Sequence, residues 1–134
     1  MKILTLSAAL ILICICSYSQ NLIGYKGKDI LKYMKMNHRE MNNNKVINGK
    51  FSYLKYSDNP ENQTVLFFLD TDSVCSRVRI IYDLSLKTNK LKELNSQFVK
   101  NGDNKWIDNH GGKKYNILLT EGIWSCTISI ESEK

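Results

Sequence analysis

The chain has 134 residues, of which 43% are hydrophobic and 24% are charged, and its formal net charge is +6. This length excludes two independent domains once an N-terminal leader is set aside. The lysines are spread along the chain, and no basic stretch is interleaved with aromatic residues, so the charge indicates a solvated basic surface and argues against nucleic-acid binding.

The N-terminus has the layout of a secretory signal peptide. A positive start at Lys2 precedes an apolar run over residues 3–16 and a pair of small residues, Ser17 and Ser19. This layout predicts a signal peptide over residues 1–19, with cleavage after Ser19 or the next residue. The run is shorter than the roughly 20 apolar residues of a transmembrane helix. We therefore expect a secreted or periplasmic protein without a stable membrane span.

Residues 20–134 are expected to form a single α+β domain that begins with a helix over residues 27–41. Ile30 and Met34 fall on one stripe of this helix, and charged residues occupy the rest of its surface. The asparagine run at 42–44 is expected to end the helix.

Three strands are predicted to follow the helix, and the last two form a hairpin around which the domain is arranged. The middle strand is apolar on both faces, whereas the last alternates with a period of two, which predicts one buried face and one wet face. The predicted strands cover residues 49–56, 64–69 and 74–83.

The second half repeats this order of elements. A helix is predicted over residues 84–99, where Leu84, Leu91, Leu94 and Phe98 recur at spacings of three and four. Glycine-containing turns then separate three short segments that read as strands. These segments cover residues 105–109, 114–120 and 123–131.

The order of helix and three strands, read twice, indicates a duplicated α-β-β-β unit. The connections within each unit are short enough for antiparallel hairpins. The predicted fold is therefore a two-layer α+β sandwich, with a six-stranded antiparallel sheet and two helices on one face.

The uncovered face of this sheet is the candidate binding surface. Cys75, Arg77 and Arg79 share one side of their strand, and Tyr53 or Lys55 lies on the neighbouring strand. Tyrosine and arginine are enriched at binding hot spots. A solvated sheet face, on which arginine stems cover apolar atoms, is the alternative interpretation.

Two of the four cysteines, Cys14 and Cys16, lie in the predicted leader, and an isoleucine before each argues against a lipidated start. Cys75 and Cys126 remain in a compartment where disulfides form, so a disulfide between them is one alternative. Their strand phases argue against it, because Cys126 alternates with apolar residues and Cys75 with arginines. A bulge that shifted one register would remove this objection.

No catalytic or metal site is indicated. Asp70 and Asp72 lack the further oxygen ligands and the glycine of a calcium loop, and they suit a hairpin turn. His38 and His110 read as solvent-facing residues and have no zinc partners at ligand spacing. A cysteine nucleophile, Cys75 with one of these histidines, is not excluded by spacing, but its flanking residues give it no support.

Several short segments give the chain a resemblance to small exported bacterial modules. It resembles the tandem α-β-β-β modules of beta-lactamase-inhibitor-like proteins and outer-membrane assembly lipoproteins, and short exported Bacteroidetes proteins of unknown function. The first resemblance lies in Gly24-Tyr25, Asp29-Ile30-Leu31, Tyr53-Leu54-Lys55-Tyr56 and Val65-Leu66-Phe67-Phe68. The second lies in Val74-Cys75, Arg79-Ile80-Ile81, Leu94-Asn95 and Trp106-Ile107.

The chain departs from the modules at Lys26, where a Ser or Thr cap is usual, and in keeping no lipidation cysteine after cleavage. The resemblance implies binding or assembly work and transfers no catalytic residue. The sequence therefore predicts an exported, non-enzymatic module without a cofactor, whose partner is an unknown protein or envelope ligand. The alternative is a small secreted hydrolase or enzyme inhibitor whose site forms only in the fold.

Overall fold

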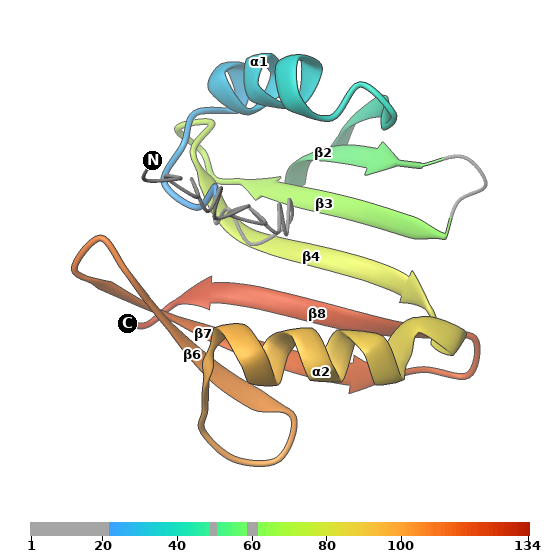
Figure 1. The fold of residues 1–134 in the computed structure, drawn as a ribbon. Coiled ribbons are helices and arrows are strands. Elements are labelled where there is room, and N and C mark those ends of the chain that lie inside the picture. Colours follow the sequence, from blue (N-terminus) through green and yellow to red (C-terminus); the bar gives the residue numbers. More distant parts are fainter. Residues whose placement is uncertain (1–21, 49–50, 59–61) are drawn as a thin grey trace, which may run out of the picture.

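The structure is a computed structural model that describes residues 22–48, 51–58 and 62–134. The predicted signal peptide, residues 1–19, lies outside the described residues. Within them the chain forms two helices, a short 3-10 turn and eight strands (Figure 1). In chain order these are α1 (Gly27–Asn37), β1 (Asn42–Asn48), β2 (Phe51–Ser57), β3 (Gln63–Leu69), β4 (Cys75–Asp83), η1 (Leu84–Leu86), α2 (Lys87–Gln97), β5 (Val99–Lys100), β6 (Lys105–His110), β7 (Lys113–Glu121) and β8 (Ser125–Ser132).

The eight strands of the described residues form one antiparallel sheet in the order β1-β2-β3-β4-β8-β7-β6-β5. The class is α+β, but the prediction of a six-stranded sheet is wrong. The two additional strands, β1 and β5, are the edges of the sheet, and each follows directly after a helix.

The two edge strands were missed for different reasons. The asparagine run was expected to form a loop because asparagine is depleted in strands. In the structure, the unpaired edge of β2 binds this backbone, and Asn43 lies opposite Tyr56. Of the two residues of β5, Val99 was assigned to the end of the second helix and Lys100 to the segment that follows it. That helix ends at Gln97, and Phe98 is already extended, so Val99 and Lys100 pair with β6.

Each half of the chain contributes one helix and four strands, and the halves meet at β4 and β8. Their pairing is reciprocal, because Val78 lies opposite Ile130 and Ile80 lies opposite Ile128. The pair Arg79–Ser129 lies between them, at the centre of the whole sheet. The strand order is also symmetric about this junction, with β3 and β7, β2 and β6, and β1 and β5 at matching positions, so the two halves are related by an approximate twofold axis through this pair.

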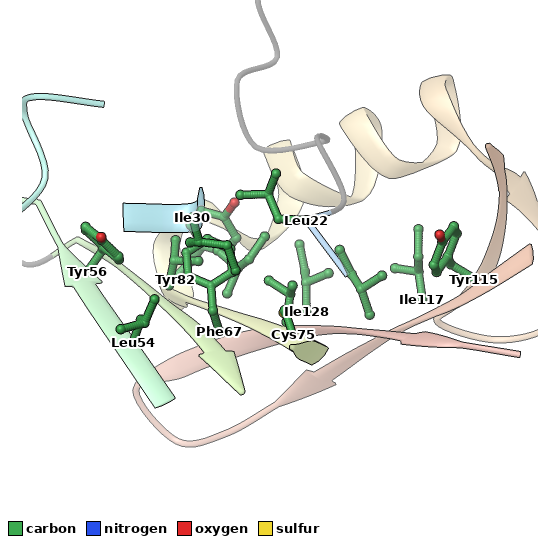
Figure 2. Close-up of a cluster of buried hydrophobic side chains, with 14 of the residues drawn as sticks. Leu22, Ile30, Leu54, Tyr56, Phe67, Cys75, Tyr82, Tyr115, Ile117 and Ile128 are labelled. Atoms are coloured by element: carbon green, nitrogen blue, oxygen red, sulfur yellow. The ribbon is translucent and has the colours of Figure 1, made fainter. Parts of the chain in front are cut away.

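Both helices lie over the same face of the sheet and define the core. Figure 1 shows α1 beside β2 and β3, and α2 beside β7 and β8. In Figure 2, Phe67, Ile117 and Ile128 project from the strands toward the helical layer. Ile30 of α1 and Leu94 of α2 are 0% and 5% exposed within one continuous hydrophobic cluster. The opposite face of the sheet, hereafter the open face, has no helix over it among the described residues.

The packing of α1 is tested by Ile30→Ala. We expect this change to lower the free energy of unfolding by about 2–5 kcal/mol, because it leaves a cavity between α1 and the sheet. The matched control is Val99→Ala. Val99 is 63% exposed, and its truncation should change stability by less than about 0.5 kcal/mol. Urea denaturation measures both values, and equal losses would contradict the placement of α1.

Candidate functional site

The open face is organised by the register of the strands. Residues directly opposite each other in an antiparallel sheet lie side by side on one face. Two rows of such residues cross the middle of the open face from β2 to β6. The first row is Tyr53, Phe68, Arg77, Glu131, Asn116 and Ile107, and the second is Lys55, Leu66, Arg79, Ser129, Leu118 and Lys105.

Phe68 is the centre of an aromatic and cationic group, hereafter the Phe68 cluster, made of Tyr53, Phe68, Arg77 and Arg79. The Cζ atom of Arg77 lies 4.5 Å from the centroid of the Phe68 ring, and that of Arg79 lies 5.5 Å from it. Arg77 is directly opposite Phe68 and Arg79 is its diagonal neighbour, so both guanidinium groups reach the same ring. The Tyr53 ring lies 5.8 Å away at an interplanar angle of 44°.

The two arginines are held with their stems buried. The Nε atoms of Arg77 and Arg79 are fully covered and have no hydrogen-bond partner in the described part of the chain. Such donors are uncommon in folded proteins, and each costs on the order of 1–3 kcal/mol. Cation–π contacts with Phe68 contribute up to about 2 kcal/mol in the opposite direction. Packing against the sheet thus positions both guanidinium groups, and Arg77 has in addition the contact of its Nη1 with Glu131.

The charges of the open face are unbalanced. The two central rows hold four cations, Lys55, Arg77, Arg79 and Lys105, against the single carboxylate of Glu131. That carboxylate is 3.5 Å from Nη1 of Arg77, and its side chain is 56% exposed. Such exposed pairs contribute little to stability. Arg79 has no ion pair among the described residues. The centre of the face therefore attracts anionic groups.

Four of the five predicted binding residues meet on the open face, and Cys75 does not. Phe68 pairs with Arg77, but the next residue, Leu69, pairs with Cys75, so Ser76 is an extra residue in β4. This β-bulge reverses the alternation at its position. Cys75 therefore points into the core and is 1% exposed. The assignment of Cys75 to the binding surface is wrong.

The two cysteines are free thiols in the structure. The bulge places both on the covered face, so the expectation that they lie on opposite faces is wrong. Cys126 is opposite Tyr82, seven residues along β4 from Cys75. At about 3.3 Å per residue this separates them by roughly 23 Å. A disulfide requires Cα atoms within about 7 Å, so this arrangement does not permit the bridge.

His38 is a second residue that the sequence misplaced. It was expected on the polar side of a longer helix, but α1 ends at Asn37 and the His38 side chain is 5% exposed. The backbone N–H group of His38 donates to the carbonyl of Met34, and the centroid of its ring lies 5.7 Å from that of the Tyr33 ring. Because the chain leaves the helix at His38, helical periodicity does not apply to it.

The acidic turn before β4 satisfies its own backbone. The Asp70 carboxylate accepts hydrogen bonds from the N–H groups of Asp72 and Val74, at 2.9 and 3.0 Å. Over the described ranges, no group of three or more His, Cys, Asp or Glu side chains is arranged to hold a metal ion.

Phe68 and Glu131 are the site residues that the sequence analysis missed. The strand over residues 64–69 was taken as apolar on both faces, so neither face was assigned to the binding surface. The structure separates the two faces, since Val65 and Phe67 are buried whereas Leu66 and Phe68 are half-buried, but the run of apolar residues carries no alternation that would have shown it. Glu131 was not accessible to sequence reasoning, because its contact with Arg77 depends on the pairing of β4 with β8.

No family model matches the chain, and no curated protein or solved structure matches it significantly. The resemblance to exported α-β-β-β modules therefore stays a prediction. Among the helices of the described residues, neither has the length and apolar character that crossing a membrane requires.

The burial of Cys75 generates a prediction about its chemistry. Burial raises the pKa of this thiol from its ordinary value of 9.0 to about 12. We expect Cys75 to resist a thiol reagent such as Ellman's reagent at pH 8 in the folded protein and to react after denaturation. Rapid labelling of Cys75 in the native protein, located by peptide mass spectrometry, would contradict this placement.

The same pKa shift makes stability dependent on pH. The unfolded thiol ionises near pH 9, whereas the folded thiol stays protonated until about pH 12. The stabilisation is therefore complete below pH 9 and is lost as the pH rises toward 12. We expect the difference in unfolding free energy between the wild type and Cys75→Ala to narrow over this range. A constant difference would argue against the shift.

Proposed function

We propose that this chain is an exported, non-enzymatic binding module that holds an acidic partner, a protein or an envelope ligand, on the Phe68 cluster. The observation that carries the proposal is the arrangement of Arg77 and Arg79 around one aromatic ring at the centre of a face with excess positive charge. Arginine and aromatic residues dominate binding hot spots.

The preorganisation of the arginines supports this proposal. A free arginine side chain loses considerable rotamer freedom when it binds a partner. In Arg77 and Arg79 the covered Nε atoms indicate that the stems are already packed against the sheet. Their terminal nitrogens can donate paired hydrogen bonds to a carboxylate or phosphate group, and these bonds are among the strongest in proteins.

The burial of the cysteines supports a binding role over a cysteine-dependent hydrolase. A nucleophilic cysteine needs a thiolate, and therefore a lowered pKa. The pKa values of Cys75 and Cys126 are both raised by burial. The inhibitor alternative remains compatible with the same surface, since an inhibitor is itself a binding protein, and identification of the partner separates it from an assembly module.

Export is proposed from the layout of residues 1–19 alone. Cleavage after Ser19 or Gln20 should give a mature protein that begins at Gln20 or Asn21. Intact-mass measurement of the protein recovered from the periplasm or the medium distinguishes these species. A chain that keeps residues 1–19 and stays inside the cell would overturn the proposal of export without affecting the binding site.

The binding proposal is tested by Arg77→Ala/Arg79→Ala, with Lys28→Ala/Lys32→Ala as the control of equal charge. Both lysines are exposed on α1, in the opposite layer of the molecule. Each protein is immobilised and incubated with the envelope fraction of the exporting cell, and captured partners are identified and titrated. We expect the arginine variant to bind at least about tenfold more weakly than the wild type.

The lysine variant should retain the affinity of the wild type, and Phe68→Leu should weaken binding because it removes the ring on which the arginines rest. Raising the salt concentration should reduce affinity in the wild type more than in the arginine variant. Equal capture by the wild type and the arginine variant would show that the partner does not use this surface.

A further inference from the structure

A second feature of the molecule, in the helical layer, is a pocket of about 580 Å³ at the C-terminal end of α1. Its volume is within the range of roughly 300–1,000 Å³ that is usual for small-molecule sites. The pocket lies between α1 and the edge of the sheet formed by β1 and β2, away from the open face. Its walls are formed by Leu31, Met34, Lys35, Met36, His38, Arg39, Met41, Asn43 and Tyr56.

The walls of this pocket gather the methionines of the protein. The chain has four methionines, and the three that lie in the described residues all line the pocket. Met34 belongs to the buried stripe of α1, and Met36 is 63% exposed at the pocket edge. The N–H group of Met41 donates to the carbonyl of His38, which turns the chain back toward the helix. Methionine side chains are flexible and polarizable, and proteins use them where an apolar surface must adapt to a ligand.

The charged side chains that line the pocket are both cations. Lys35 and Arg39 are both exposed, and the lining residues include no carboxylate. Lys35 also lies in the last turn of α1, where its charge compensates the negative end of the helix dipole. Arg39 lies beyond the helix end and is the residue expected to attract an anionic group most strongly.

We propose that this pocket binds an aliphatic carboxylate, such as a medium-chain fatty acid. The aliphatic chain lies among Leu31 and the three methionines, and the carboxylate lies at the edge near Arg39 and Lys35. An apolar wall with a cationic edge fits an amphipathic anion better than a neutral hydrocarbon or a fully polar anion. This inference does not depend on the proposed function, because the Phe68 cluster lies on the other face of the sheet.

The methionines make the proposal directly measurable. In protein labelled with ¹³C at the methionine methyl groups, Met34, Met36 and Met41 report on the pocket, and Met1, outside the described residues, is the one further methionine of the sequence. Titration with octanoate, decanoate and dodecanoate, below the concentrations at which they form micelles, should shift the three signals together and to saturation. Affinity should rise about fourfold for each added methylene group.

Two variants of exposed pocket residues, each with a matched control, separate the roles of the pocket without disturbing the core. Arg39→Ala should weaken decanoate binding about three- to tenfold, whereas Lys28→Ala removes the same charge from an exposed position of α1 outside the pocket and should have no effect. Met36→Ser should weaken binding several-fold. Val99→Ser is its matched control, because both residues are 63% exposed and Val99 lies outside the pocket.

The possible results decide the proposal in both directions. It is supported if octanoate binds more tightly than 1-octanol and if this preference is lost in Arg39→Ala. Equal binding of octanoate and 1-octanol would overturn the carboxylate assignment. Methionine signals that stay in place at millimolar dodecanoate, or equal effects of Met36→Ser and Val99→Ser, would overturn the site itself.

Discussion

The pairing of β4 with β8 is the interaction on which the rest of the structure depends. It joins two halves that are each of a size at which an isolated core is only marginally stable. Val78 and Ile80 of one half meet Ile130 and Ile128 of the other, so the apolar row continues across the junction. The same register places Arg79 beside Ser129 on the open face. One pairing thus sets the continuity of the core and the position of the candidate site.

The approximate twofold axis separates what the two halves share from what differs between them. On the covered face, corresponding positions are apolar in both halves, as with Phe67 and Leu119, which lie opposite Val78 and Ile128. On the open face, the counterparts of the cluster residues are small and polar. Phe68 corresponds to Thr120, Arg77 to Thr127 and Arg79 to Ser129.

This asymmetry bears on the interpretation of the Phe68 cluster. A sheet face that only contacts solvent requires no difference between the two halves. The threonines and the serine of the second half are sufficient for such a face. The aromatic and cationic residues are concentrated in the first half, close to the centre of the sheet. The shared fold therefore does not account for the difference, and the residues concentrated in the first half are of the types enriched at binding hot spots.

The sequence predicted the parts of the fold that depend on local pattern. It failed where pairing with a strand elsewhere in the chain determines the local structure. An apolar run located β3, and alternation located β4. Periodicity located the start of α1 and the region of α2, which begins at Lys87 after the 3-10 turn at Leu84–Leu86. β1 was missed because asparagine has a low strand propensity, and only the exposed edge of β2 makes that backbone pair. The bulge at Ser76 was missed because Cys75, Arg77 and Arg79 keep an uninterrupted period of two in the sequence.

In the Phe68 cluster, the cost of the covered Nε donors and the gain from the cation–π contacts are of similar size. Two covered Nε donors without partners cost on the order of 2–6 kcal/mol together. Two cation–π contacts return about 1–4 kcal/mol. The cluster is thus close to neutral or slightly unfavourable by itself, and the register of β3 and β4 holds Arg77 and Arg79 beside Phe68. Glu131 already contacts Nη1 of Arg77, whereas Arg79 has no ion pair among the described residues. An anionic group that accepts bonds from the terminal nitrogens of Arg79 therefore adds a favourable contribution that the isolated protein lacks, while the stem needs no further ordering.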